Sequence, residues 1–159
     1  MAKMYSFGRG LGAAMRAVRL RKVLEWGPGR STVQILADKN VESILCFEHN
    51  PNWYEKYKTI SIDTRVALCF QQDLDLYVKT PTGLFDLIFI DGRKREECLT
   101  RSLLLSQNEG IVIIHDAERV RYHPFIQQWP NYIWSPEKEV AVMSYSIETI
   151  RRWREEYGC

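Results

Sequence analysis

Short apolar runs recur along the chain and alternate with longer segments of mixed polarity. The run at 85–90 (FDLIFI) is nearly all apolar, which is typical of a strand that is covered on both faces. Only residues 135–139 separate the last two runs, so these two are expected to form an antiparallel hairpin. The pattern predicts strands at residues 22–26, 43–48, 65–70, 85–90, 110–115, 132–134 and 140–145.

Helix-like segments fill the intervals between these runs. Alternating strands and helices imply parallel strands, right-handed crossovers and helices on both faces of the sheet. We therefore expect an α/β protein with a Rossmann-like, doubly wound, mostly parallel seven-stranded sheet that ends in an antiparallel hairpin. One domain is expected over residues 1–159, with an N-terminal helical segment (1–21), a core (22–145) and a C-terminal helix (146–159). Helices are expected at residues 11–20, 31–39, 51–58, 94–106 and 124–129.

The composition narrows the class of protein. Of 159 residues, 45% are apolar and 26% are charged, as in ordinary globular domains. The net charge of +2 does not indicate nucleic-acid or membrane binding, and no apolar run approaches the roughly 18 residues of a membrane span. The four cysteines lack the paired spacing of metal sites or disulfide frameworks, so we expect reduced thiols and a cytoplasmic location.

Polar side chains follow each of the first five predicted strands. In open sheets of this kind, ligands bind beyond the carboxyl ends of the strands, where the strand order reverses. We therefore expect a ligand site at this edge of the sheet. The polar residues are Glu25, Glu48 with His49, Gln71 to Asp73, Asp91, and His115 with Asp116.

The segment VLEWGPGRST (23–32) joins the first predicted strand to a helix. Gly27 and Gly29 would let the backbone turn tightly and approach a ligand, although glycines that serve only the turn would look the same. Ser31 and Thr32 would cap the helix, whose start favours a carboxylate or phosphate. Thr32 also replaces the third glycine of a dinucleotide loop, G-x-G-x-x-G, which favours a smaller ligand with an adenosine end and an amino-acid end.

Glu48 ends the second predicted strand, 21 residues after Gly27, where an acid can accept hydrogen bonds from ribose hydroxyls. The stretches VLEWGPGRST, CFEHN, FDLIFIDGR and GIVIIHDAER together resemble the class I S-adenosylmethionine-dependent methyltransferases over residues 22–145. The resemblance implies that S-adenosylmethionine is the cofactor and that its methyl group goes to an oxygen or nitrogen of a small acceptor. It also implies that Glu25, Gly27, Gly29, Ser31 and Thr32 hold the methionine moiety, Glu48 the ribose hydroxyls, His49 one side of the adenine and Asp73 the adenine amino group.

Asp91, His115 and Asp116 are the candidate catalytic residues, because they would converge at the mouth of the cleft. Two carboxylates and an imidazole suit a divalent ion such as Mg²⁺, and the pattern is similar to metal-dependent small O-methyltransferases and to sugar O-methyltransferases. Ala117 stands where the former group often has a second acid or asparagine, so the sequence leaves the metal open. The alternatives are a metal-free general base at His115, or a His115 that points into the sheet beside an Asp116 that caps the next helix.

Arg93, Lys94 and Arg95 lie at the expected start of the helix at 94–106. Positive charge at a helix start is unfavourable by roughly 0.3–1 kcal/mol, so an anionic acceptor would explain these residues. The core takes up most of the chain, and the acceptor site should therefore be shallow. It could draw on the N-terminal segment, the loop after the fifth strand and a neighbouring subunit, which makes a homo-oligomer consistent with the sequence.

Three other functions fit parts of this pattern. The same cofactor could serve a different reaction, such as transfer of its aminoalkyl group. An NAD-dependent oxidoreductase is disfavoured by Thr32 at the third glycine position. A non-catalytic subunit that binds a partner would not need Glu25, Gly27, Gly29 and Glu48.

Overall fold

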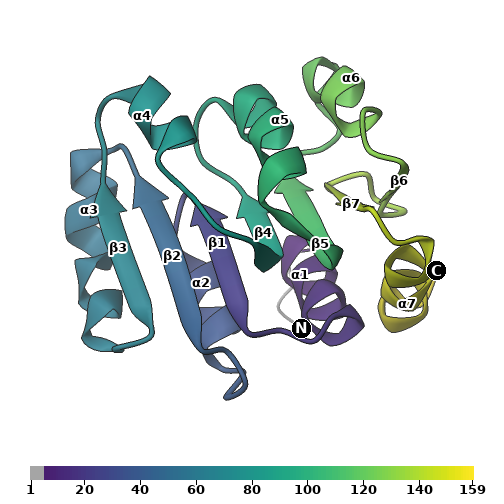
Figure 1. Cartoon of the computed structure of the whole chain (residues 1–159), viewed down its shortest axis with the longest axis horizontal. Coiled ribbons are helices and arrows are strands. Elements are labelled where there is room, and N and C mark those ends of the chain that lie inside the picture. The colour runs from purple at the N-terminus through teal and green to yellow at the C-terminus, as the bar shows by residue number, and fades with distance from the viewer. Residues whose placement is uncertain (1–5) are drawn as a thin grey trace.

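A computed structural model of the chain describes residues 6–159, and within this part seven strands form one sheet (Figure 1). The strands are β1 (Lys22–Trp26), β2 (Ser43–Glu48), β3 (Val66–Phe70), β4 (Phe85–Ile90), β5 (Ser106–His115), β6 (Asn131–Trp134) and β7 (Val140–Ser144). Their order is β3-β2-β1-β4-β5-β7-β6. The first five strands are parallel, and β7 is antiparallel to both of its neighbours. The predicted fold class, with its C-terminal hairpin, is confirmed.

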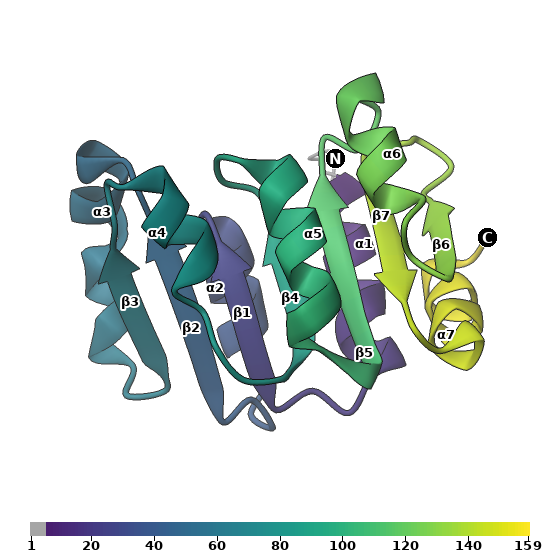
Figure 2. The ribbon, with the colours of Figure 1, turned by 45° about the horizontal axis from the view of Figure 1, so that its top comes forward.

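Helices cover both faces of the sheet (Figure 2). They are α1 (Ser6–Ala17), α2 (Arg30–Leu36), α3 (Pro51–Tyr57), α4 (Leu74–Lys79), α5 (Arg95–Leu105), α6 (His123–Ile126) and α7 (Ile147–Tyr157), with the short 3₁₀ helices η1 (Lys58–Ile62) and η2 (Val120–Tyr122). Buried side chains of α1, α2 and α7 form one core, and those of α4, α5 and α6 form the other.

The two cores explain the apolar run at 85–90. Successive side chains of a strand point to opposite faces of the sheet. Along β4, Leu87 and Phe89 therefore enter the core under α1, α2 and α7, whereas Ile88 and Ile90 enter the core under α4, α5 and α6. All four are fully buried, so each face of this central strand must be apolar.

Two elements, α4 and β5, differ from the predicted ones. The pattern does not predict α4, because six residues are too few to show a helical period; Asp73 caps this helix by accepting hydrogen bonds from the main-chain N–H groups of Asp75 and Leu76. β5 begins at Ser106 rather than at residue 110. The reason is a register shift, by which Ser106 pairs with Phe85 while Ile111 pairs with Leu87.

The N-terminal helix also lies elsewhere than expected. α1 covers Ser6–Ala17 rather than 11–20, and residues 1–5 of the predicted N-terminal segment lie outside the described residues. Gly10 of α1 allows close packing, because a Cβ atom there would lie 2.7 Å from Cγ2 of Val140. α1 also packs on α7, where Trp153 Nε1 donates to the carbonyl of Gly10 (3.0 Å).

No helix within residues 6–159 is long and apolar enough to cross a membrane.

Candidate functional site

A cavity of about 750 Å³ opens at the carboxyl ends of β1, β2 and β4. β1 pairs with β2 on one side and with β4 on the other, so the strand order reverses here. Ligands of doubly wound sheets bind at such a point, and the volume suits a nucleotide-sized molecule. The lining comes from Phe7 of α1, the glycine loop (27–31), residues 48–50, part of α3, Leu74, residues 91–96 (the loop after β4 with the start of α5) and the segment after β5.

Gly27 is required by the geometry of this loop. Its φ is +89°, a conformation that side chains disfavour, and an added Cβ would lie 2.7 Å from the backbone nitrogen of Gly92. The loops after β1 and β4 therefore touch through backbone alone. Gly29 differs, because its φ of 179° is extended backbone that any residue can adopt. Its Cβ would make only ordinary contacts with Trp53 and Tyr57, so the tight turn predicted for both glycines depends on Gly27.

A buried carboxylate lies beneath the glycine loop. Glu25 accepts hydrogen bonds from the hydroxyls of Ser31 and Thr32 (2.6 Å for Thr32), and the Cys46 thiol lies 3.6 Å away. The Thr32 hydroxyl in turn accepts from the N–H of Gly29 (3.0 Å). Glu25 and Thr32 are fully buried, whereas Ser31 also lines the cavity.

This arrangement corrects the predicted helix cap for Ser31, whereas Thr32 takes part in capping by accepting from the N–H of the N-cap residue Gly29. α2 begins at Arg30 with Gly29 as its N-cap, so Ser31 and Thr32 lie inside the first turn and their hydroxyls point to Glu25. Glu25 and Thr32 support the loop from below, and their contact with a cofactor stays a prediction. Burial raises the pKa of Glu25 to about 7, although the hydrogen bonds from Ser31, Thr32 and Cys46 act in the opposite direction.

Glu48 and His49 stand at the tip of β2, on the wall of the cavity. Oε1 of the buried Glu48 accepts from the N–H groups of His49 (2.8 Å) and Asn50 (2.7 Å). The His49 ring meets Tyr77 edge-on at 5.8 Å, and burial lowers its pKa despite the nearby Glu48 charge. His49 Nδ1 lies 3.1 Å from Glu48 Oε1 but makes no aligned hydrogen bond. The His49 ring is therefore uncharged at pH 7 and contributes an aromatic surface to the cavity.

Asp73 does not line the cavity. Its carboxylate caps α4, and the next residue, Leu74, reaches the lining instead. The structure therefore gives no direct support for the predicted contact of Asp73 with the adenine amino group, which stays a prediction.

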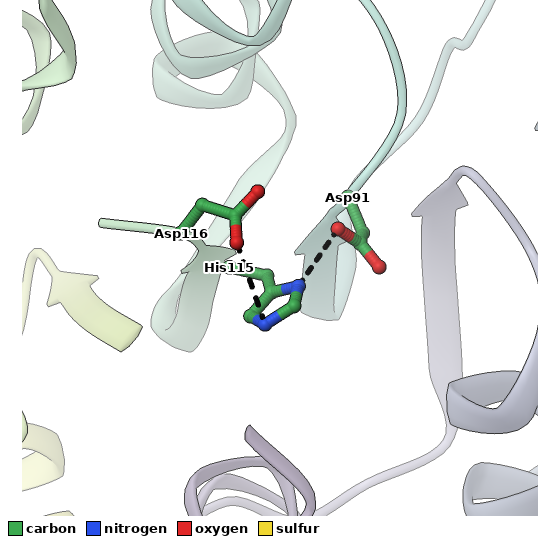
Figure 3. A group of neighbouring side chains, drawn as sticks. All are labelled: Asp91, His115 and Asp116. Atoms are coloured by element: carbon green, nitrogen blue, oxygen red, sulfur yellow. Dashed lines mark hydrogen bonds and ion pairs between the residues drawn. The ribbon is translucent and has the colours of Figure 1, made fainter. Parts of the chain in front are cut away.

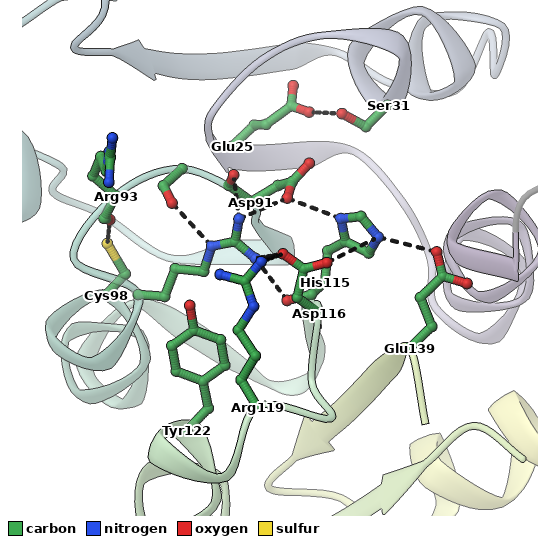
Figure 4. A network of polar contacts seen from close by, with 12 residues as sticks. Glu25, Ser31, Asp91, Arg93, Cys98, His115, Asp116, Arg119, Tyr122 and Glu139 are labelled. Atoms are coloured by element: carbon green, nitrogen blue, oxygen red, sulfur yellow. Dashed lines mark hydrogen bonds and ion pairs between the residues drawn. The ribbon is translucent and has the colours of Figure 1, made fainter. Parts of the chain in front are cut away.

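The three candidate catalytic residues come together at the tips of β4 and β5 (Figure 3). His115 Nδ1 lies 2.9 Å from Asp91 Oδ1, and Nε2 lies 3.7 Å from Asp116 Oδ1. A fourth residue, Glu139, places Oε1 3.1 Å from His115 Nε2 (Figure 4). Burial lowers the pKa of His115, but the carboxylates of Asp91 and Glu139 outweigh this effect, and the pKa is raised above its ordinary value.

Arg95 joins the ends of the same two strands. Its guanidinium group donates to the carbonyl oxygens of Gly92 (2.9 Å), Asp91 (3.0 Å) and His115 (2.8 Å). It also lies 3.1 Å from a carboxylate oxygen of Asp91 and 3.1 Å from one of Asp116. Its side chain is only 12% exposed. Arg95 therefore holds the ends of β4 and β5 together. The sequence had instead suggested that it binds an anionic acceptor.

Three residues other than glycine adopt a left-handed backbone conformation around this network. They are Lys94 (φ +46°), Asp116 (φ +55°) and Lys138 (φ +60°). Lys94 precedes α5, Asp116 follows β5, and Lys138 precedes Glu139 in the β6–β7 hairpin. Such backbone costs on the order of 1 kcal/mol or more per residue and tends to gather at functional sites. The positions of these three residues are consistent with a site centred on the tips of β4 and β5.

Positive charge dominates the lining of the cavity. Seven cationic and three acidic side chains take part, namely Arg30, Lys56, Arg93, Lys94, Arg95, Arg119 and Arg121 against Glu48, Asp91 and Glu96. Some are neutralised by acids of the protein itself: Lys94 pairs with Asp75 (2.7 Å), and Arg119 pairs with Asp116 (2.8 Å). Because the cations outnumber the acids, the lining favours anionic groups of a ligand over cationic ones.

No protein-family model and no curated protein matches the sequence. Solved structures do share its fold. Spermidine synthase from Thermotoga maritima superimposes with a TM-score of 0.71 at 18% identity, and the match covers 94% of this chain and 62% of that one. A spermidine synthase in complex with the transition state analogue AdoDATO gives 0.73 at 18% identity, covering 94% and 64%. A methyltransferase-like protein from Silicibacter pomeroyi DSS-3 gives 0.66 at 13% identity, covering 99% and 96%.

These likenesses define the class of fold. The chain has the Rossmann-like fold of the class I S-adenosylmethionine-dependent methyltransferases, and the resemblance found in the sequence is confirmed at this level. The chain spans less than two thirds of the spermidine synthase chains and nearly all of the methyltransferase-like chain.

The buried Glu25 should make stability depend on pH. Its pKa is about 7 in the folded protein against 4.5 as the ordinary value, so folding favours the protonated form. The free energy of unfolding should then fall by about 3 kcal/mol as pH rises from about 4 to about 8. Glu25→Gln stays neutral and should lose this part of the slope in urea unfolding.

The exposed Glu118→Gln is the control and should keep the slope of the unmodified protein. His115, with its raised pKa, adds a fall of the same sign above its ordinary value of 6.5, and both variants retain that part. Equal slopes in Glu25→Gln and Glu118→Gln would show that Glu25 is not buried in the way described.

Proposed function

We propose that the protein binds S-adenosylmethionine in this cavity and that its methyl group is transferred to an oxygen or nitrogen of a small anionic acceptor. The observation that carries the proposal is the cavity at the reversal of strand order, where the Gly27 loop and Glu48 face the same space. The fold shared with methyltransferase-like structures supports it.

The lining suits each part of the cofactor. The loop at 27–31 provides close backbone for the amino-acid part, since Gly27 leaves no side chain in the way. Glu48, already fixed by two main-chain N–H groups, can accept hydrogen bonds from ribose hydroxyls. The neutral ring of His49 offers a flat surface for the adenine. When bound, S-adenosylmethionine supplies a methyl group on a sulfonium that a nucleophile displaces.

The charges favour an anionic acceptor and therefore methyl transfer. Aminopropyl transfer, as in a spermidine synthase, requires an amine acceptor, and amines are cations at neutral pH. The excess of cations in the lining would repel such an acceptor. Of the acids in the lining, Asp91 is already paired with Arg95 and Glu96 with Arg121, and Glu48 is assigned to the ribose.

Of the three candidate catalytic residues, Asp91 lines the cavity, and His115 and Asp116 do not. Arg95 and His115 both contact Oδ1 of Asp91, so they fix its orientation. We assign Asp91 to the acceptor, as the carboxylate that orients it or takes its proton. His115 is a poor general base, because both of its ring nitrogens lie against carboxylates.

Product analysis tests the reaction. The protein, S-adenosylmethionine and a panel of small carboxylates, phenols and diamines are incubated and the nucleoside products separated by chromatography. Methyl transfer yields S-adenosylhomocysteine, and we expect it with an anionic acceptor. Formation of methylthioadenosine with a diamine would show aminoalkyl transfer instead and would overturn the proposal.

Glu48 should contribute strongly to cofactor affinity. A hydrogen bond to a charged group is worth about 1.5–3 kcal/mol, so Glu48→Ala should weaken binding of S-adenosylhomocysteine by roughly 10- to 100-fold in isothermal titration calorimetry. Glu42→Ala, near the other end of β2 and far from the cavity lining, should bind like the unmodified protein. If Glu48→Ala bound equally well, the assignment of the ribose to Glu48 would be wrong.

A further inference from the structure

Asp91, His115 and Asp116 look at first like a site for a divalent metal ion. One ligand atom from each lies within 4.8 Å of the others (Figure 3). They stand at the tips of two adjacent strands and border the cavity through Asp91. Oxygen ligands of this kind suit Mg²⁺ or Mn²⁺. Whether they are available depends on what the carboxylates already contact.

Guanidinium groups already bind both carboxylates. Arg95 lies 3.1 Å from Oδ1 of Asp91 and 3.1 Å from Oδ2 of Asp116, so it bridges the two acids as a shared metal ion would. Arg119 adds a second contact to Oδ2 of Asp116, at 2.8 Å. Arg95 cannot withdraw easily, because three main-chain carbonyl groups also accept its hydrogen bonds. Its withdrawal would leave these acceptors without their donor in a largely buried place.

The imidazole is engaged as well. A metal ion needs the lone pair of a neutral ring nitrogen, but His115 Nδ1 faces Asp91 and Nε2 faces Glu139 (Figure 4). The other groups near the ring are Asp116, 3.7 Å from Nε2, and the apolar ring of Phe7 from α1, at 5.1 Å. Carboxylates on both sides favour the doubly protonated ring, in which each nitrogen donates to an acid.

The charges of this network balance without a metal. Three carboxylates, those of Asp91, Asp116 and Glu139, face two guanidinium groups and one imidazolium. A divalent ion would add two positive charges to a partly buried and already neutral cluster, which is costly unless protons or arginines leave. The residues therefore do not fit a resident metal ion.

The geometry points to a metal-independent site, in which Arg95, Arg119 and the imidazolium of His115 take the place of a divalent cation and Glu139 is the positioning residue that holds this imidazolium. Glu139 reaches His115 because the next residue, Val140, pairs with His115 across β5 and β7. The N–H of Ala117 also donates to the Glu139 carbonyl (3.0 Å), which ties the hairpin to the loop after β5. The hairpin thus completes the site with a carboxylate.

The inference rests on the proposed function for the ligand of the cavity, but metal binding can be measured without that ligand. The electron paramagnetic resonance signal of free Mn²⁺ should stay unchanged when the full-length protein is added, with or without S-adenosylhomocysteine. A His115→Gln/Arg119→Gln double variant loses two of the three positive charges and should bind Mn²⁺ more tightly than the unmodified protein. One equivalent of Mn²⁺ bound by the unmodified protein and lost in Asp116→Asn would overturn the inference.

The role of Glu139 has its own readout. Nuclear magnetic resonance of the histidine ring protons should show a pKa of His115 above its ordinary value, and Glu139→Gln should lower it. Glu137→Gln, in the same turn, is the matched control, because the Glu137 carboxylate contacts the Tyr157 hydroxyl rather than His115. A pKa of His115 that Glu139→Gln leaves unchanged would contradict the assigned role. If S-adenosylhomocysteine fails to bind while these results hold, the proposed function fails and the metal-free network stands.

Discussion

The glycine loop depends on one buried interaction, in which two hydroxyl groups of α2 donate to the carboxylate of Glu25. This interaction fixes the first turn of the helix against the end of β1. With the turn fixed, Gly27 lies against the backbone of Gly92, and the loops after β1 and β4 form the floor of one cavity. The energetic cost is a carboxyl group whose ionisation burial opposes. A loop held this way presents backbone to a ligand without rearranging, which lowers the entropy lost on binding.

At the tips of β4 and β5 the site is held together by charged side chains, whereas at the tip of β1 it depends on Gly27. Arg95 joins the tips of β4 and β5, and the hairpin adds Glu139 on the far side of His115. Asp91, Arg95 and Arg119 of this network line the cavity, whereas His115, Asp116 and Glu139 do not. Asp116 and Lys138, both with left-handed backbone, lie on either side of the same network.

The sequence predicts the central strands well for a physical reason. β1, β2 and β4 are buried on both faces or nearly so, and their apolar runs begin and end where the strands do. The start of β5 is missed, because Ser106 joins the sheet through a register shift that a polar stretch does not reveal. Among the site residues, those at strand tips could be named, since parallel strands bring their carboxyl ends to one edge. The role of Arg95 at the two strand ends could not be predicted, because it depends on where α5 begins. Glu139 could not be named at all, because its position depends on the register of a hairpin.

The proposed function requires an adenosyl ligand over the tips of β1 and β2. A crystal structure of the protein with S-adenosylhomocysteine tests it most directly. We expect electron density for the ligand above Gly27, with the ribose hydroxyls at the carboxylate of Glu48. Density for the ligand elsewhere on the protein, with this cavity left to solvent, would contradict it.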